Sequence, residues 1–243
     1  MNAWGLTDPG MVRSQNQDTF FLQHLSDTDL LAVVCDGMGG ARSGNVASQL
    51  ALEVFTASVQ ELWKEQTSVE EIFALLQHSA DEANRRVYEQ SGLGEEYRGM
   101  GTTLVAALVQ KSTAYIVNVG DSRAYHAGKH GISLITRDHS LIQMMVQRGE
   151  LTWEEAREHP GKHLITRAVG TEQKVESDVY QVDLEQGDSI LLCSDGLSNV
   201  LADQEILFEI AHGESKDDCC QRLLAIAQNR GAPDNVTVVL VSL

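Results

Sequence analysis

Three apolar segments of this chain end at an aspartate that stands beside a glycine, in LLAVVCDG, AYIVNVGDS and SILLCSDG. These aspartates are Asp36, Asp121 and Asp195, and a fourth, Asp234, comes before an apolar segment, in APDNVTVVLV. In an antiparallel sheet the end of one strand lies beside the start of its neighbour. Antiparallel strands can therefore bring all four acids to one edge, and Asp18, just before the segment TFFLQHL, can join them.

Each aspartate alone has a simpler interpretation, because Asp-Gly and Asp-Asn are common turn-forming pairs. Five aspartates at comparable positions favour a shared site instead. Like charges that converge repel one another unless a cation neutralises them, and oxygen ligands without His or Cys select hard ions such as Mg²⁺ or Mn²⁺. Gly37 fits this hypothesis, since a residue without a side chain can turn its carbonyl oxygen to a metal held by Asp36.

The order of the remaining patterns predicts an α+β fold with mostly antiparallel sheets. Strands cluster and helices come between the clusters, whereas a parallel sheet requires strict alternation of the two. After the glycine-rich segment the period becomes helical, with Val46, Leu50 and Val54 four residues apart. The predicted strands are residues 3–7, 19–25, 30–35, 102–109, 113–120, 122–128, 131–136, 175–184, 189–196 and 236–243. The predicted long helices are residues 45–63, 69–90, 203–211 and 216–230.

Residues 139–166 interrupt this succession of strands. Their sequence predicts two short helices around Gly149, followed by Pro160-Gly161. We interpret this segment as an excursion from the sheet and a candidate for a mobile flap. Because no repeat, low-complexity tract or linker divides the chain, the sequence predicts one domain over residues 1–243.

A formal net charge of −17 argues against a nucleic acid or an anionic membrane as partner, because no basic stripe is present to contact phosphates. The start of the chain, MNAWGLTDPG, lacks the pattern of a signal peptide. No apolar segment approaches the ~20 residues that span a bilayer. The four cysteines have no C-x-x-C spacing, which favours buried free thiols. We therefore expect a cytoplasmic protein.

The glycine-rich segment CDGMGGARSG, residues 35–44, nearly matches several phosphate-binding loops and fits none. A P-loop requires lysine directly after its second glycine, but Asn45 follows Gly44. The dinucleotide motif has Arg42 where its third glycine belongs, and a cysteine-phosphatase loop requires an arginine where Ala41 stands. What these motifs leave unexplained is Asp36.

Arg13 lies five residues before Asp18, in GMVRSQNQD, so a short loop can carry it to the same edge. A guanidinium that faces a metal cluster is suited to holding phosphate oxygens. The simpler interpretation is a surface arginine paired with a carboxylate. Two metals, an arginine and no nucleophilic side chain together indicate that a metal-bound hydroxide attacks a phosphoryl group.

The chain resembles the metal-dependent Ser/Thr protein phosphatases of the PPM (type 2C) family, in their compact bacterial form. The matching motifs are GMVRSQNQD, VCDGMGG, GMGTTLVAAL, VGDSRAY, TRDHS, LITRAVG, LLCSDGL and DNVTVV. Each motif alone is weak, but together they occur in the family's order and cover essentially the whole chain.

The resemblance implies a four-layer α/β/β/α sandwich of two antiparallel sheets flanked by helices, with metals in a cleft at one edge. It implies two core Mn²⁺ or Mg²⁺ ions and a third. It also implies hydrolysis of phosphoserine and phosphothreonine by a water or hydroxide that bridges the two core ions. The implied partners are phosphorylated proteins, including a Ser/Thr kinase and its substrates, in bacterial signal transduction. We expect a monomer.

Carried over by position, the resemblance implies that Asp36 bridges two metals. Asp195 and Asp234 would complete the first metal site, and the Gly37 carbonyl would bind the second metal. Asp18 would act through metal-bound water.

The resemblance also implies roles outside these two core sites. Asp121, together with Asp195, matches the third metal site of bacterial members. Arg13 would hold the substrate phosphate. The segment after Asp138 matches the family's flap, which influences substrate access.

One departure concerns the group that protonates the departing serine or threonine oxygen. Many bacterial members have His where this chain has Ala41, and animal members have His at the position of Met38. A water on the third metal is the first candidate for this acid, and His163 in the flap is the second. We expect His139 to organise the turn of the RDHS motif.

Two other functions remain open on the sequence. GDSRA, residues 120–124, imitates the nucleophile turn of serine hydrolases, with Ser122 as the nucleophile, although no convincing His base with an orienting acid accompanies it. The alternative within the family is a non-catalytic metal-binding domain that recognises phosphoproteins.

Overall fold

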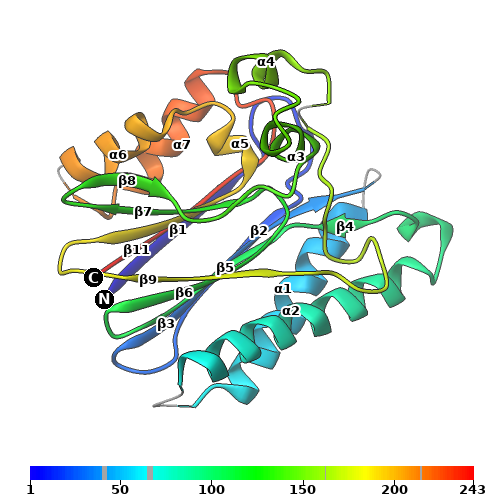
Figure 1. Cartoon of the computed structure of the whole chain (residues 1–243), viewed down its shortest axis with the longest axis horizontal. Coiled ribbons are helices and arrows are strands. Elements are labelled where there is room, and N and C mark those ends of the chain that lie inside the picture. The colour runs from blue at the N-terminus through cyan, green and yellow to red at the C-terminus, as the bar shows by residue number, and fades with distance from the viewer. Residues whose placement is uncertain (40–42, 65–67, 162, 214) are drawn as a thin grey trace.

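The computed structural model describes residues 1–39, 43–64, 68–161, 163–213 and 215–243 (Figure 1). Ala41, where the sequence departs from the bacterial pattern, lies outside the described residues. Two antiparallel sheets face each other in the middle of the molecule, and helices cover their outer faces. This is the α/β/β/α sandwich that the resemblance implied.

The first sheet has the strand order β1-β11-β10-β7-β8. Its strands are β1 (Asn2–Asp8), β11 (Val236–Ser242), β10 (Ser189–Cys193), β7 (Arg123–Gly128) and β8 (Gly131–Leu134). The second sheet has the order β2-β3-β5-β6-β9, with β4 paired to the end of β3. Its strands are β2 (Asp18–His24), β3 (Asp29–Met38), β4 (Gly101–Thr102), β5 (Leu104–Gln110), β6 (Thr113–Val119) and β9 (Asp178–Asp183).

Two long helices, α1 (Ser43–Leu62) and α2 (Val69–Ser91), cover the second sheet (Figure 1). The first sheet is covered by α5 (Asp195–Ser198), α6 (Asp203–His212) and α7 (Cys219–Asn229). Two short helices, α3 (Leu141–Gln147) and α4 (Trp153–Glu158), lie in the segment between β8 and β9. A 3₁₀ turn, Glu95–Tyr97, follows α2.

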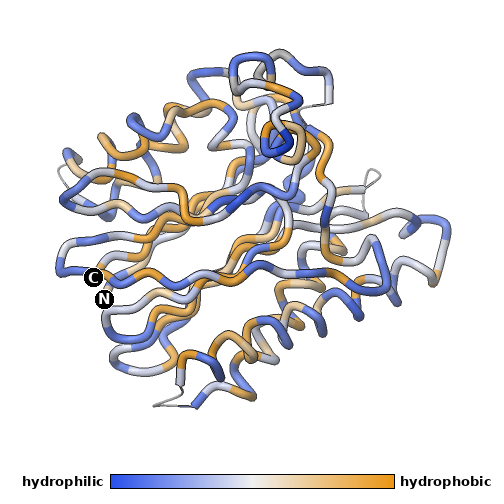
Figure 2. Tube along the Cα trace, in the orientation of Figure 1, coloured by the Kyte–Doolittle hydropathy of each residue, from blue (hydrophilic) through white to orange (hydrophobic). Residues whose placement is uncertain are grey.

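Strand β3 shows why the apolar segments form this sandwich. Leu31 and Val33 point to the helices, while Ala32 and Val34 point to the opposite sheet, because successive side chains of a strand alternate between its faces. A strand buried on both faces must be apolar throughout, as LLAVV is. Figure 2 shows the resulting apolar colour along the strands on both sides of the inter-sheet layer.

The elements differ from the sequence prediction mainly at their ends. The strand predicted over residues 30–35 continues to Met38, because β4 pairs with it beyond Asp36. The strand predicted over residues 189–196 ends at Cys193, since Asp195 begins the short helix α5. None of the described helices combines the length and apolar character needed to cross a membrane.

Candidate active site

Asp18 and Asp36 face each other directly in the ladder between β2 and β3. Residues opposite each other on antiparallel strands have Cβ atoms about 5 Å apart, and like charges in this arrangement are destabilising. The pair lies where β2 begins and where β3 nears its end, at the edge of the sheet predicted for the acids. The sheet register therefore places two carboxylates where only a cation or a proton relieves their repulsion.

Asp18 also connects the two sheets. Its Oδ2 accepts hydrogen bonds from the hydroxyls of Ser194 and Thr237, each at 2.7 Å, and both donors belong to the opposite sheet or its edge. Its Oδ1 is buried and receives no hydrogen bond from a donor among the described residues, although a protonated Asp36 carboxyl would act as a hydrogen-bond partner of Asp18 and lower its pKa. A buried carboxylate oxygen without a donor is rare in proteins and calls for an explanation, of which a bound ion is one.

The other predicted acids reach the same place from different elements. Asp121 lies in the turn between β6 and β7, Asp195 begins α5, and Asp234 comes two residues before β11. Burial is the main cause that raises the pKa of Asp36 well above its ordinary value, and the charges of Asp18, Asp195, Asp121 and Asp234 add to it. All five aspartates predicted from the sequence are thus close enough to act on one another.

The same two causes act on the neighbouring carboxyls. Burial raises the pKa of Asp18 to about 6 and that of Asp121 to about 7, and in both cases the charge of Asp195 contributes. The pKa of Asp195 is also raised, first by burial and then by Asp234. Burial disfavours the charged form of a carboxyl, and nearby like charges do the same.

Gly37 is a glycine because backbone atoms crowd it. A Cβ at this position would lie 2.2 Å from the carbonyl oxygen of Gly44 and 2.7 Å from that of Gln17. The Gly37 amide donates to the Gln17 carbonyl at 3.1 Å. This packing brings the start of α1 against the strand that carries Asp36, so Gly37 has a structural role in addition to the metal role predicted for its carbonyl.

Two threonines that the sequence analysis did not single out hold the backbone of Asp36. Thr103 Oγ accepts from the Asp36 amide at 2.9 Å, and Thr102 Oγ donates to the Asp36 carbonyl at 2.8 Å. Thr103 Oγ also lies 2.7 Å from Ser122 Oγ. The motif GMGTTLVAAL contains both threonines, but nothing in its pattern shows that their hydroxyls turn toward Asp36.

The same geometry contradicts the serine-hydrolase hypothesis. Ser122 is fully buried, and its hydroxyl is engaged with Thr103. A nucleophile must be accessible to substrate and next to a base. Ser122 meets neither condition and acts instead as a structural hydroxyl beside Asp121.

Arg13 reaches the acid cluster, as predicted, and pairs there with Asp234. Its Nη2 lies 2.8 Å from Asp234 Oδ2, and its side chain is 55% exposed. The hydrogen bond to Asp234 is the main cause that raises the pKa of Arg13, and the charges of Asp36 and Asp195 also contribute. Arg13 thus forms the arginine–carboxylate pair of the simpler interpretation, and this pair lies beside the other acids.

His163 is exposed and lies near Asp195. Its electrostatic interaction with Asp195 opposes the rise in the pKa of that carboxyl. Met38 ends β3 and pairs with Gly101. His163, the histidine considered as a proton donor, thus lies close enough to interact with the acids.

The donor set fits a hard divalent cation by its chemistry. It offers carboxylate oxygens, one of them buried and without a donor among the described residues, and burial followed by the negative charge of neighbouring acids raises the pKa values of Asp36 and Asp121. Among the described residues, no three or more His, Cys, Asp or Glu side chains are grouped so that they could hold a metal ion. The fit therefore rests on the unpartnered oxygen and on the charge of the cluster, which match the preferences of Mg²⁺ and Mn²⁺.

Comparison with known proteins gives a consistent result over the whole chain. A family model described as Protein phosphatase 2C matches residues 12–233. The chain is 37% identical over 244 residues to the Serine/threonine phosphatase stp of Listeria monocytogenes serotype 4b, covering 99% of this chain and 95% of that protein. It is 36% identical to the Protein phosphatase PhpP of Streptococcus pneumoniae serotype 2, covering 98% and 96%.

Solved structures agree with these relatives. The serine/threonine phosphatase of S. agalactiae superposes with a TM-score of 0.93 at 36% sequence identity, covering 100% of this chain and 99% of that one. The serine/threonine phosphatase PstP/Ppp of Mycobacterium tuberculosis superposes with a TM-score of 0.88 at 34% identity, covering 100% and 98%.

Proposed function

Because this chain belongs to the protein phosphatase 2C family, we propose that it hydrolyses phosphoserine and phosphothreonine in proteins. The observation that carries the proposal is the facing pair Asp18 and Asp36, with the buried, unpartnered Oδ1 of Asp18. Two carboxylates held in this way destabilise the fold by their repulsion, and a bound cation would relieve that repulsion. The family is metal-dependent in general.

We propose that Asp36, Asp195 and Asp234 hold one core ion, and that Asp36 and the Gly37 carbonyl hold a second. Asp121 and Asp195 would hold a third ion, and Asp18 would orient the attacking water. When bound, Mn²⁺ or Mg²⁺ would lower the pKa of water and offset charge on the phosphoryl group. The protein's own task is then to keep these oxygens at one edge, which Thr102, Thr103, Ser194 and Thr237 do by their hydrogen bonds.

Arg13 is proposed to bind the substrate phosphate. In the structure its Nη2 bonds Asp234, which orients the guanidinium toward the acid cluster. Charge-assisted hydrogen bonds contribute about 1.5–3 kcal/mol each. We expect Arg13→Ala to lower kcat/KM for a phosphothreonine peptide roughly 10- to 100-fold, chiefly through KM, and Arg13→Lys to lose less. The control is Arg86→Ala, which removes an arginine paired with Glu89 on α2. An unchanged KM in Arg13→Ala would remove Arg13 from the substrate site.

A water on the third metal is the first candidate for the acid that protonates the leaving oxygen, and His163 is proposed as the candidate among the side chains of the protein. General acids contribute about 100- to 10,000-fold, and they matter most when the leaving group is a poor one. We expect His163→Ala to slow a phosphothreonine peptide roughly 100-fold while slowing p-nitrophenyl phosphate only a few-fold, because nitrophenolate leaves without a proton. His24→Ala, at the exposed far end of β2, is the control. Equal slowing of both substrates would assign the loss to substrate binding and not to proton transfer.

The experiment that tests the function is phosphate release from a phosphothreonine peptide with Mn²⁺, with EDTA, and with the variant Asp195→Ala. Activity that requires both the metal and Asp195 supports the proposal. The control Asp203→Ala removes an acid at the start of α6 and should leave turnover unchanged. Turnover that survives EDTA and Asp195→Ala would exclude the metal mechanism.

The non-catalytic alternative is not favoured. The relatives that match over nearly the full length are named as phosphatases, and every acid predicted for the site is present. Metal binding by the wild-type chain without any turnover would restore this alternative.

The substrates of such an enzyme are phosphorylated proteins, and we propose that a Ser/Thr kinase supplies them. The four cysteines are all free and buried, which suits a reducing compartment, so we place the protein in the cytoplasm. We propose a monomer with residues 139–166 as a flap over the site.

A further inference from the structure

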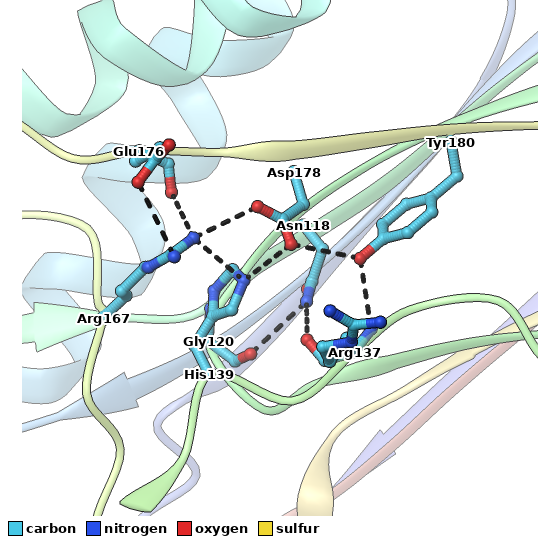
Figure 3. A network of polar contacts seen from close by, with 8 residues as sticks. All are labelled: Asn118, Gly120, Arg137, His139, Arg167, Glu176, Asp178 and Tyr180. Atoms are coloured by element: carbon cyan, nitrogen blue, oxygen red, sulfur yellow. Dashed lines mark hydrogen bonds and ion pairs between the residues drawn. The ribbon is translucent and has the colours of Figure 1, made fainter. Parts of the chain in front are cut away.

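His139 joins the start of the flap to the turn that carries Asp121. Its backbone amide donates to the Gly120 carbonyl at 2.9 Å, and the Gly120 amide donates to His139 Nδ1 at 3.1 Å. Figure 3 shows the imidazole lying against Gly120. The ring is buried, with 6% of the residue exposed, so this pair of hydrogen bonds is shielded from competing water.

The contacts of the ring determine its tautomer. Since Nδ1 accepts from Gly120, Nε2 carries the proton, and it faces Asp178 Oδ2 at 3.2 Å. Arg167 Nη1 lies 3.4 Å from the same Nε2 but is itself a donor, and it reaches Asp178 Oδ1 at 3.1 Å (Figure 3). The Asp178 carboxylate therefore accepts from both His139 Nε2 and Arg167 Nη1, and His139 Nδ1 remains the acceptor for the Gly120 amide.

The charges around the ring agree with this tautomer. Burial lowers the pKa of His139, although the hydrogen bond to Asp178 opposes the change. The neutral ring keeps a lone pair on Nδ1, whereas an imidazolium would have none to offer Gly120.

The turn that carries Asp121 is held from the other side by Thr103. Gly120 has a φ of +111°, and a Cβ there would lie 2.6 Å from Thr103 Cγ2. Thr103 Oγ bonds Ser122 Oγ at 2.7 Å and the Asp36 amide at 2.9 Å. The residues on both sides of Asp121 are thus fixed, Gly120 by His139 and Ser122 by the threonine that also holds Asp36.

The flap closes onto the same histidine. The Thr166 amide donates to the His139 carbonyl at 2.7 Å, and Ser140 and Ile165 form an antiparallel bridge. The two ends of the flap therefore meet at His139, one hydrogen bond away from the turn of Asp121.

We infer that His139 is a positioning residue for the phosphatase reaction. Through its hydrogen bonds to Gly120, it holds the turn that carries the Asp121 carboxylate in a fixed position relative to the two ends of the flap. This inference deepens the proposed function and rests on it. The described contacts of His139 are with Gly120, Thr166, Arg167 and Asp178 and not with Asp121, so it acts through the backbone that it fixes. Residues in this position behind metal ligands typically change metal affinity or activity about 10- to 100-fold when they are replaced.

Three replacements separate the acceptor role from simple packing. His139→Asn keeps an oxygen near the place of Nδ1 and can still accept from Gly120. His139→Gln places its polar end near Asp178 but offers Gly120 no acceptor, and His139→Ala removes both contacts. The readouts are Mn²⁺ affinity by calorimetry, the amide exchange rate of a peptide containing Gly120, and the melting temperature in EDTA.

We expect His139→Ala and His139→Gln to weaken the weakest Mn²⁺ site about 10-fold and to speed exchange at Gly120, and His139→Asn to stay within a few-fold of the wild type. The matched control is His126→Ala on β7. It removes another histidine–carboxylate pair, in which His126 Nε2 lies 2.8 Å from Asp188 Oδ2. It should lower the melting temperature without changing Mn²⁺ affinity.

Unchanged Mn²⁺ affinity in His139→Ala, or equal losses in all three variants in proportion to their melting temperatures, would overturn the inference. If His139→Ala fails to fold, Asp178→Ala, which removes the acceptor of Nε2, must show the same selective loss. Since Mn²⁺ affinity is measured without substrate, a wild-type chain that binds Mn²⁺ but releases no phosphate would reject the proposed function and leave this test intact.

Discussion

Replacing Asp36 with Asn should lower phosphate release from a phosphothreonine peptide by roughly 1,000-fold or more while making the metal-free protein more stable. A thousandfold corresponds to about 4 kcal/mol of transition-state stabilisation, the scale of losing several kcal/mol of charge stabilisation by a metal. The gain in stability has a separate cause, because the substitution removes a carboxyl that faces Asp18 across β2 and β3 and must there either repel it or hold a proton. We expect the free energy of unfolding in EDTA to rise by roughly 1 kcal/mol.

The control for Asp36→Asn is the same substitution at the opposite end of the same strand. Asp29 is buried, and its carboxylate accepts from Thr28 and Gln110. Asp29→Asn should lower stability and leave turnover per folded molecule unchanged. Loss of both activity and metal-free stability in Asp36→Asn would contradict the assignment, because it would mean that Asp36 serves the fold and not an ion.

In EDTA, the free energy of unfolding should fall as the pH rises from 5 to 7.5, and saturating Mn²⁺ should abolish or reverse this fall. The pKa of Asp18 is raised to about 6 and that of Asp121 to about 7 by burial and by neighbouring acids. A carboxyl with a raised pKa in the folded state binds its proton more tightly there than in the unfolded chain. The stability that the proton supplies is therefore present at low pH and lost as the pH rises through these values.

Asp18 alone should account for a change on the order of 2 kcal/mol. His139 opposes the trend, since burial lowers its pKa and protonation favours the unfolded chain below neutral pH. Comparison with Asp18→Asn isolates the acid, because this variant should flatten the profile in EDTA and lose the stabilisation by Mn²⁺. Urea titrations at several pH values give the profile. A rise of stability with pH in the metal-free wild type would show that burial and the neighbouring charges do not raise the pKa values of Asp18 and Asp121.

Most of what could be predicted came from patterns among residues that are close together in the chain. Asp36, Asp121, Asp195 and Asp234 were recognised because each stands where an apolar strand begins or ends, a pattern that local sequence shows directly. The antiparallel α+β class followed from strands and helices in clusters, and the sandwich was what the resemblance to the family implied. The ends of strands were less accurate, as at Met38, because pairing with a distant segment decides where a strand stops.

The contacts that give these acids their properties join residues far apart in the chain. Sequence alone cannot show that Asp18 faces Asp36, that Ser194 and Thr237 occupy one oxygen of Asp18, or that its other oxygen has no donor. Ser122 illustrates the limit, since its motif indicates a nucleophile and only its burial against Thr103 excludes one.

The sequence by itself determined which residues of this protein carry charge and at which strand ends they stand, because polarity and periodicity are local properties. Only the tertiary structure decided which of them interact. Strand register sets the pair Asp18–Asp36, and the tautomer of His139 is set by the turn after β6, which places Gly120 at one ring nitrogen, and by the start of β9, which places Asp178 at the other. Both depend on the distances between segments more than fifteen residues apart, which folding alone fixes.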